Sequence, residues 1–246
     1  MRALREAASL IWPTSCAGCG LELASPLCQC CRLELLGPVT RRESGADRLV
    51  PADGGPVLPV WSSAWYAGQV RQAITAWKRG GRAELDSEMA RAVARSAEKV
   101  ARVLRPVTPQ LTVVPVPSRW LRQLQRVGGG TGALAAAAAG ALAGAGLKVE
   151  LVEALTRVSS SGEQAGRGAR QRLLGREGTT RVSRRPGWPC LLVDDVLTTG
   201  ATLLDAERAL ARVGVATVGA VVLAVSPAQS GFVANRLERQ ALDGAV

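Results

Sequence analysis

Two adjacent carboxylates at the end of an apolar run constrain this chain more than any other feature. The segment from Cys190 to Val193 is apolar, Asp194 and Asp195 follow it, and residues 198–202 read Thr-Thr-Gly-Ala-Thr before a helical pattern begins. An apolar run, a polar turn and an amphipathic segment in this order predict a buried strand, a loop and the start of a helix. Further strands alternate with helices along the chain, which predicts a parallel, doubly wound sheet of the α/β class.

The turn after the two acids has the composition of a phosphate site. Backbone N–H groups from Thr199 to Thr202 can converge at a helix N-terminus, where the helix dipole favours an anion. The acids cannot bind phosphate, but they can accept hydrogen bonds from sugar hydroxyls or hold Mg²⁺. Together these groups indicate a ribose 5-phosphate ligand. The competing interpretation is an ordinary turn capped by a threonine, although two adjacent like charges are unfavourable there without a ligand or cation.

A second motif lies near the N-terminus, where five of the six cysteines fall between residues 16 and 31. Four of them form two C-x-x-C pairs, Cys16 with Cys19 and Cys28 with Cys31. Each pair forms a turn that presents two thiolates, and two such turns close a tetrahedral Zn²⁺ site. Because the chain has no His, a structural zinc site would use Cys16, Cys19, Cys28 and Cys31. Cys30 is the alternative to Cys28. Disulfides are the competing interpretation, which a cytoplasmic location disfavours.

Composition narrows the classes of function. The absence of His excludes Ser-His-Asp and Cys-His catalysis, and the net charge of +11 suits either polyanionic substrates or nucleic acid. The longest apolar run, Leu134 to Leu147, is too short to span a bilayer, and the N-terminus lacks a signal-peptide pattern. We therefore expect a cytoplasmic protein without a membrane span.

The chain divides into three predicted parts: an N-terminal arm and zinc module over 1–36, a linker or loop over 37–57, and an α/β domain over 58–246. Periodicity predicts helices over 68–78, 84–104, 131–145 and 202–213, and strands over 58–67, 111–117, 148–152, 190–194 and 216–225. Residues 156–185 are polar and aperiodic, which inside a compact domain is typical of a functional loop. Cys190 is expected to be a buried thiol.

The order of these features resembles the ComF family of phosphoribosyltransferase-like proteins, also called the competence protein F family. The likeness covers nearly the whole chain, and it is carried by Cys16 to Cys31, Tyr66-Ala67-Gly68 through Lys78, Val114-Pro115-Val116-Pro117, Leu155-Thr156-Arg157 with Gln164 and Arg170, and Leu192 to Thr202. The last segment resembles the phosphoribosyl-pyrophosphate (PRPP) signature of type I phosphoribosyltransferases. The resemblance implies a type I phosphoribosyltransferase-like parallel sheet flanked by helices, with a small N-terminal four-cysteine zinc module.

The resemblance also implies roles for individual residues. PRPP would be bound by Asp194, Asp195, Val196, Leu197, Thr198, Thr199, Gly200, Ala201 and Thr202. Among these, Asp194 and Asp195 would be the catalytic pair and would take the ribose hydroxyls directly or through Mg²⁺, while residues 198–202 would take the 5-phosphate. Candidates for the pyrophosphate side are Mg²⁺, Lys78, Arg119, Arg126, Arg167 and Arg170.

The chain departs from the family pattern at one place. After the Val-Pro-Val-Pro strand the family shows Arg-Gly followed by an aromatic residue or His, whereas this chain reads Arg126-Val127-Gly128-Gly129-Gly130-Thr131. A glycine-rich turn before a helix can bind an anion through its backbone, and it can equally be a plain helix lead-in.

Functions of two classes are compatible with these features. A phosphoribosyltransferase would transfer phosphoribosyl from PRPP to a nitrogen acceptor and release pyrophosphate, and the intact acid pair favours it. A non-catalytic PRPP- or nucleotide-binding protein, or a DNA-uptake accessory with single-stranded DNA or competence proteins as partners, is favoured by the zinc module and the charge. A zinc-dependent scaffold in a larger assembly is a third interpretation.

Overall fold

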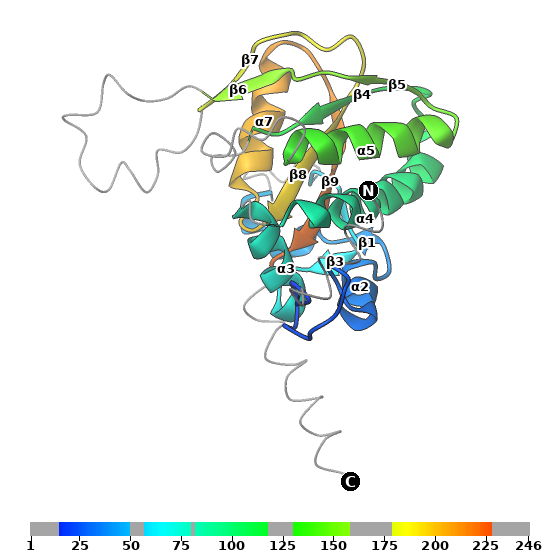
Figure 1. Cartoon of the computed structure of the whole chain (residues 1–246). Helices are drawn as coiled ribbons and strands as arrows, with labels where there is room; N and C mark the ends of the chain where they lie inside the picture. Colours follow the sequence, from blue (N-terminus) through cyan, green and yellow to red (C-terminus); the bar gives the residue numbers. More distant parts are fainter. Residues whose placement is uncertain (1–14, 50–56, 80–81, 118–129, 158–178, 228–246) are drawn as a thin grey trace, which may run out of the picture.

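The computed structural model describes residues 15–49, 57–79, 82–117, 130–157 and 179–227 (Figure 1). The predicted N-terminal arm, most of the predicted functional loop and the last residues of the chain lie outside these ranges.

A mostly parallel sheet forms the centre of the molecule. Its strands are, in spatial order, β1 (Thr40–Arg41), β2 (Val60–Ser62), β9 (Thr217–Val225), β8 (Cys190–Leu197), β4 (Gln110–Pro115) and β5 (Lys148–Leu151), and β3 (Ala64–Trp65) pairs with the distal part of β9. Within this sheet the edge strand β1 is antiparallel and the other pairings are parallel. The predicted α/β class is therefore confirmed.

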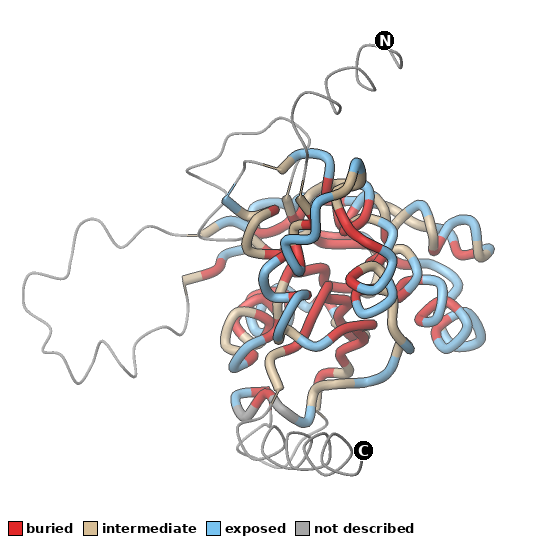
Figure 2. The backbone as a smooth tube through the Cα atoms, turned by 60° about the horizontal axis from the view of Figure 1, so that its bottom comes forward, coloured by how far each residue is buried: buried red, intermediate tan, exposed pale blue. Residues whose placement is uncertain are grey.

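Helices cover both faces of the sheet (Figure 1). One face packs against α3 (Gly68–Lys78), α4 (Asp86–Leu104) and α5 (Thr131–Gly144), and the 3-10 turn η3 (Ala83–Leu85) leads into α4. The other face packs against α7 (Ala201–Arg212), against Ala46, which follows the 3-10 turn η1 (Glu43–Gly45), and against Leu49 of the 3-10 turn η2 (Asp47–Leu49). Since both faces are covered, the central strands are buried along most of their length (Figure 2).

Two smaller units flank the sheet. Residues 15–36, which we call the cysteine module, contain the four clustered cysteines and α2 (Gln29–Leu35), and they lie beside α3 (Figure 1). Strands β6 (Leu155–Arg157) and β7 (Thr180–Val182) form an antiparallel pair. This pair brings together the two ends of the long polar segment that we predicted to be a functional loop.

The observed boundaries differ from the predicted ones mainly at the acid pair. Strand β8 continues to Leu197, beyond the predicted end at residue 194, because β9 runs beside it as far as Val225. Helix α7 begins at Ala201, one residue before the predicted start. The stretch predicted as a linker or loop over 37–57 contains β1, η1 and η2. The three-part division of the chain stays a prediction.

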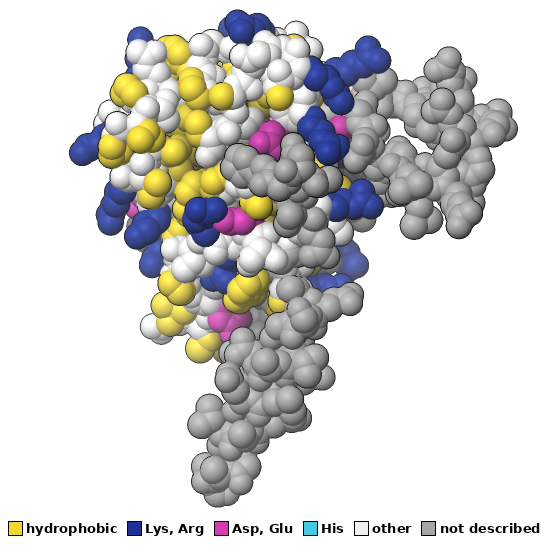
Figure 3. Space-filling view, turned by 180° about the vertical axis from the view of Figure 1, so that it is seen from behind, with side chains coloured by type: hydrophobic (Ala, Val, Ile, Leu, Met, Phe, Trp, Pro, Cys, Tyr) yellow, Lys and Arg dark blue, Asp and Glu magenta, His cyan; other side chains and the backbone are white. Residues whose placement is uncertain are grey.

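The surface of the described residues carries basic side chains across the face shown in Figure 3, with few carboxylates among them. On that face the basic groups are spread over several elements and are not gathered in one stripe. Within the described ranges, no helix combines the length and the apolar character that crossing a bilayer requires.

Candidate phosphate and sugar site

The site is built at the carboxyl end of β8, where ligands of open α/β sheets bind. The turn of residues 198–200 joins β8 to α7, and the side chains of Thr198 and Thr199 are exposed there. The first intrahelical bond of α7 runs from the N–H of Leu204 to the carbonyl of Gly200, at 2.9 Å. The N–H groups of residues 201–203 therefore have no partner inside the helix, which is the arrangement that suits an anion.

Gly200 gives the turn its shape. Its φ of +83° lies in the left-handed region, and a Cβ at this position would stand 2.5 Å from Cγ of Leu49. The neighbouring Arg48 N–H donates a hydrogen bond to the carbonyl of Thr199, at 3.1 Å. Thus η2 packs against the outside of the turn, and only glycine fits between them. Sequence reasoning missed this contact, since it treated residues 37–57 as a linker or exposed loop.

The two acids lie on opposite faces of β8. Asp194 is in register with Val222, whose side chain belongs to the core under α7. Because successive side chains of a strand point to opposite faces, Asp195 is directed to the side of α3, α4 and α5. Each carboxylate accepts the next backbone N–H: Asp194 Oδ1 from Asp195 at 2.8 Å, and Asp195 Oδ1 from Val196 at 2.6 Å.

Burial determines the charge state of Asp194. Its side chain is enclosed, and burial together with the neighbouring charge of Asp195 raises the pKa of Asp194 to about 8, although its own bond from the Asp195 N–H and the cations Lys78 and Arg157 act in the opposite direction. Two adjacent buried carboxyl groups are therefore held with less than two full negative charges near neutral pH. A ligand that donates hydrogen bonds or a bound cation would favour the charged form.

Lys78 is the counter-ion of Asp195. Its Nζ lies 2.8 Å from Asp195 Oδ2, and both side chains are largely buried, at 25% and 12% exposure. Lys78 is the last residue of α3. We predicted it as a pyrophosphate-side candidate, and the structure places it at the acid pair.

Arg157 is a further cation near the acid pair that sequence reasoning did not single out as a site residue. It ends β6, and its guanidinium donates to the carbonyl of Pro117 at 3.3 Å and to Thr179 Oγ1 at 3.5 Å. Thr179 in turn donates to Asp205 Oδ2 of α7 at 3.1 Å. Arg157 thus links the end of β4 to α7 beside Asp194. Its position at the start of a long polar segment was the available signal.

Not every predicted site residue can be placed. Val196 and Leu197 belong to β8, and the Leu197 side chain is buried, so these two residues can offer a ligand little more than backbone. The Leu197 carbonyl already accepts the N–H of Ser226, at 2.8 Å. The four arginine candidates for the pyrophosphate side lie outside the described residues: Arg119, Arg126, Arg167 and Arg170.

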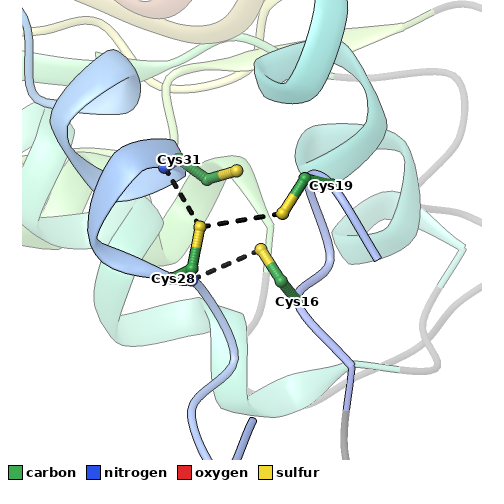
Figure 4. A group of neighbouring side chains, drawn as sticks. All are labelled: Cys16, Cys19, Cys28 and Cys31. Atoms are coloured by element: carbon green, nitrogen blue, oxygen red, sulfur yellow. Dashed lines mark hydrogen bonds between the residues drawn. The ribbon is translucent and has the colours of Figure 1, made fainter. Parts of the chain in front are cut away.

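The cysteine module brings together the four predicted ligands (Figure 4). The Sγ atoms of Cys16, Cys19, Cys28 and Cys31 all lie within 4.8 Å of one another, and those of Cys19 and Cys28 are 3.7 Å apart. In a tetrahedral zinc site with Zn–S bonds of about 2.3 Å, sulfur atoms are separated by about 3.8 Å. The donor set and its spacing therefore fit Zn²⁺. Cys30 is exposed and is not part of this group.

Backbone N–H groups donate hydrogen bonds to two of these sulfurs, and the pKa values of the thiols differ: that of Cys16 is lowered, whereas those of Cys19 and Cys31 are raised. Cys16 Sγ accepts the N–H groups of Gly18 at 3.4 Å and Cys28 at 3.3 Å, and Cys28 Sγ accepts that of Cys31 at 3.4 Å. Burial alone would raise the pKa of the Cys16 thiol, but the backbone donors of Cys19, Cys28 and Gly18 outweigh it and lower that pKa to about 6. All six cysteines are free, and burial raises the pKa of Cys190 to about 12, as expected for a buried thiol.

Comparison with known proteins agrees with this site. Residues 132–236 match a family model described as "Phosphoribosyl transferase domain", and this stretch includes β8, the turn and α7. No curated protein matches the chain.

Similar solved structures include the hypoxanthine phosphoribosyltransferase of Trypanosoma cruzi in complex with its product IMP, at 14% identity, with 58% of this chain and 78% of that chain covered and a TM-score of 0.34. A glutamic acid mutant from an analysis of an invariant aspartic acid in HPRTs is similar at 15% identity, with 58% and 79% covered and a TM-score of 0.34.

Proposed function

We propose that this protein binds PRPP at the carboxyl end of β8 and transfers its phosphoribosyl group to a nitrogen acceptor, with release of pyrophosphate. The observation that carries the proposal is the sequence of groups along β8, the turn and α7. There, two adjacent acids are followed by a glycine-shaped turn at a helix N-terminus. The match of residues 132–236 to a phosphoribosyl transferase domain supports the same class of ligand.

In the proposed complex the 5-phosphate lies against the N–H groups at the start of α7 and the hydroxyls of Thr198, Thr199 and Thr202. The ribose hydroxyls donate to Asp194 and Asp195, which then lose part of their mutual repulsion. These carboxylates lie beside the sugar, where positive charge develops as the bond from C1 to pyrophosphate breaks. The acceptor nitrogen forms the new bond to C1, the bonding electrons leave with pyrophosphate, and the nitrogen loses its proton.

Two metal ions belong to this proposal. Mg²⁺ suits the carboxylate oxygens of the acid pair and would neutralise pyrophosphate, together with the arginine candidates named above. Zn²⁺ suits the four sulfurs of the cysteine module, where a site closed by four thiolates is structural. Neither ion is required to explain the hydrogen bonds at the acid pair, which this chain makes with its own backbone and with Lys78.

The decisive test is calorimetric titration of the protein with PRPP in the presence of Mg²⁺. We expect the double variant Asp194→Asn with Asp195→Asn to remain folded and to lose PRPP binding by at least about a hundredfold, because its charge-assisted hydrogen bonds to the sugar are removed. The matched control is Glu98→Gln with Glu153→Gln, which makes the same change of net charge on exposed side chains. Equal affinity of the two double variants would contradict the site assignment.

A pyrophosphate-release screen against nitrogen bases then separates the two classes of function. Release in one acceptor well would establish a transferase and identify the class of its substrate. Binding without release across all acceptors would favour a PRPP-binding protein without turnover. Absence of PRPP binding by the unmodified protein would contradict both and would direct attention to DNA or a protein partner.

A further inference from the structure

The cysteine module is fastened to the helices on one face of the sheet. Arg32 of α2 makes a two-pronged ion pair with the buried Glu88 of α4: Nε lies 3.0 and 3.1 Å from the two carboxylate oxygens, and Nη2 lies 2.9 Å from Oε1. Arg82 Nη2 donates to the carbonyl of Ser15 at 2.8 Å. Planar, bidentate pairs of this kind fix orientation as well as distance. The module is therefore held in a defined pose.

The same module packs against α3. A Cβ on Gly18 would stand 2.7 Å from Cys31 Sγ and 3.2 Å from the carbonyl of Gln69, so the first C-x-x-C turn lies directly against the start of α3. Buried side chains of the module, including Leu27 and Leu35, belong to one continuous core with Ile74 and Trp77 of α3. Any displacement of the cysteine turns would thus open the packing of this helix.

Helix α3 runs from the cysteine module to the acid pair. It has 11 residues and is therefore about 16 Å long. At its far end the indole N–H of Trp77 donates to Asp86 at 2.7 Å, and the next residue, Lys78, makes the 2.8 Å ion pair with Asp195. One helix thus contacts the cysteine turns at its beginning and the acid pair at its end.

We propose that the cysteine module controls PRPP binding through α3: with its metal bound it fixes the helix whose last residue, Lys78, holds Asp195 in the binding geometry. The inference rests on the proposed function and assigns Lys78 as a positioning residue. Short loops such as residues 15–28 bury little apolar area of their own, so a structural metal supplies the order that they pass on to α3. Loss of the metal would loosen the packing of the module against α3, and the Lys78–Asp195 ion pair would be held less firmly as a result.

The test is a cycle that combines zinc removal with the Lys78→Met substitution. Zinc is removed with a zinc-selective chelator, the protein is exchanged into Mg²⁺ buffer, and PRPP affinity is measured by calorimetry. We expect zinc removal to weaken PRPP binding of the unmodified protein about tenfold, and to change the affinity of Lys78→Met by less than about twofold. An equal loss in both backgrounds, or no loss in the unmodified protein, would overturn the inference.

A second variant decides the matter if the zinc-free protein unfolds. Arg32→Gln removes the clamp on Glu88 and leaves all four thiols in place, so its zinc content should equal that of the unmodified protein. We expect it to weaken PRPP binding about three- to tenfold, with no further loss when it is combined with Lys78→Met. Arg91→Gln is the matched control, because Arg91 reaches the same Glu88 from the exposed side at 3.7 Å, and it should leave the affinity unchanged.

Linkage provides a readout other than PRPP affinity. If zinc strengthens PRPP binding, PRPP must strengthen zinc binding by the same factor. PRPP should therefore slow zinc release to a colorimetric chelator in the unmodified protein and have no effect in Lys78→Met. Failure of the zinc-loaded unmodified protein to bind PRPP would refute the proposed function, whereas PRPP binding that ignores zinc would refute only this inference.

Discussion

Asp194 illustrates how a candidate site residue can be held at a cost to the stability of the fold. Its pKa is raised to about 8 by burial and by Asp195, whereas an unfolded aspartate titrates near 4. The folded protein therefore binds more protons than the unfolded chain between these values, and its free energy of unfolding falls as the pH rises from about 4 to about 8. A ligand that hydrogen-bonds to the charged pair would offset this loss of stability.

We therefore expect Asp194→Asn to stabilise the ligand-free protein at pH 8 by about 1–3 kcal/mol, since asparagine keeps the oxygen that accepts the Asp195 N–H and carries no charge. At pH 4 the difference should nearly vanish, because the folded aspartate is then neutral and the unfolded one gains little by ionising. Thermal unfolding of both proteins across this pH range measures the effect. A gain in melting temperature of equal size at both pH values would contradict the charge argument.

Gly200 makes a different prediction at the same scale. Alanine there would adopt a strained φ of +83° and would place its Cβ 2.5 Å from Leu49, so we expect Gly200→Ala to destabilise the protein by roughly 2 kcal/mol. At Gly140 of α5 a Cβ would meet no heavy atom within 4 Å, and Gly140→Ala should be neutral or stabilising by up to about 1 kcal/mol. Urea unfolding of both variants tests the contrast. An equal change in the free energy of unfolding would contradict the argument that Leu49 of η2 leaves no room for a Cβ at residue 200.

At the scale of elements, the cysteine module predicts one zinc per chain. We expect Cys16→Ser to lose the metal and to lower the melting temperature by several degrees, because it removes one of four thiolates from a closed site. Cys30→Ser is the control, since Cys30 is exposed and outside the group, and it should keep both the metal and the stability. Metal analysis of the three purified proteins decides the point. Loss of zinc in Cys30→Ser would instead identify Cys30 as a ligand.

Elements with strong periodicity were predictable, and the contacts between them were not. Helix α3 was predicted with its observed bounds because its buried residues Val70, Ile74 and Trp77 repeat at helical spacing. The end of β8 was missed because it is set by pairing with β9, and the pairing of two separate segments is not visible in the local pattern of either. Likewise, the segment with the two 3-10 turns was interpreted as a linker or loop, because its buried apolar residues Ala46, between the turns, and Leu49, at the end of η2, are too few for a pattern.

At the scale of the whole molecule, the candidate site divides in the same way. The acids, the turn and the four cysteines are each local motifs, so the sequence alone could single them out as candidate site residues. The ion pair of Lys78 with Asp195 and the approach of Arg157 to Asp194 depend on how distant segments meet at the carboxyl edge of the sheet. For this reason the sequence predicted Lys78 only as a candidate for the pyrophosphate side. Its partner, Asp195, could be identified only from the fold.

The contact between η2 and Gly200 means that the segment with the two acids and the turn does not form its structure independently of the rest of the chain. Residues 190–212 form a strand, a turn and a helix, yet the outer side of the turn is completed by Arg48 and Leu49, which come from far earlier in the chain. Grafting the signature onto another sheet, or beginning the protein at residue 58, would leave Gly200 facing open space and the Thr199 carbonyl without this donor. Exchange of such motifs between proteins would have to carry along the distant segment that encloses them.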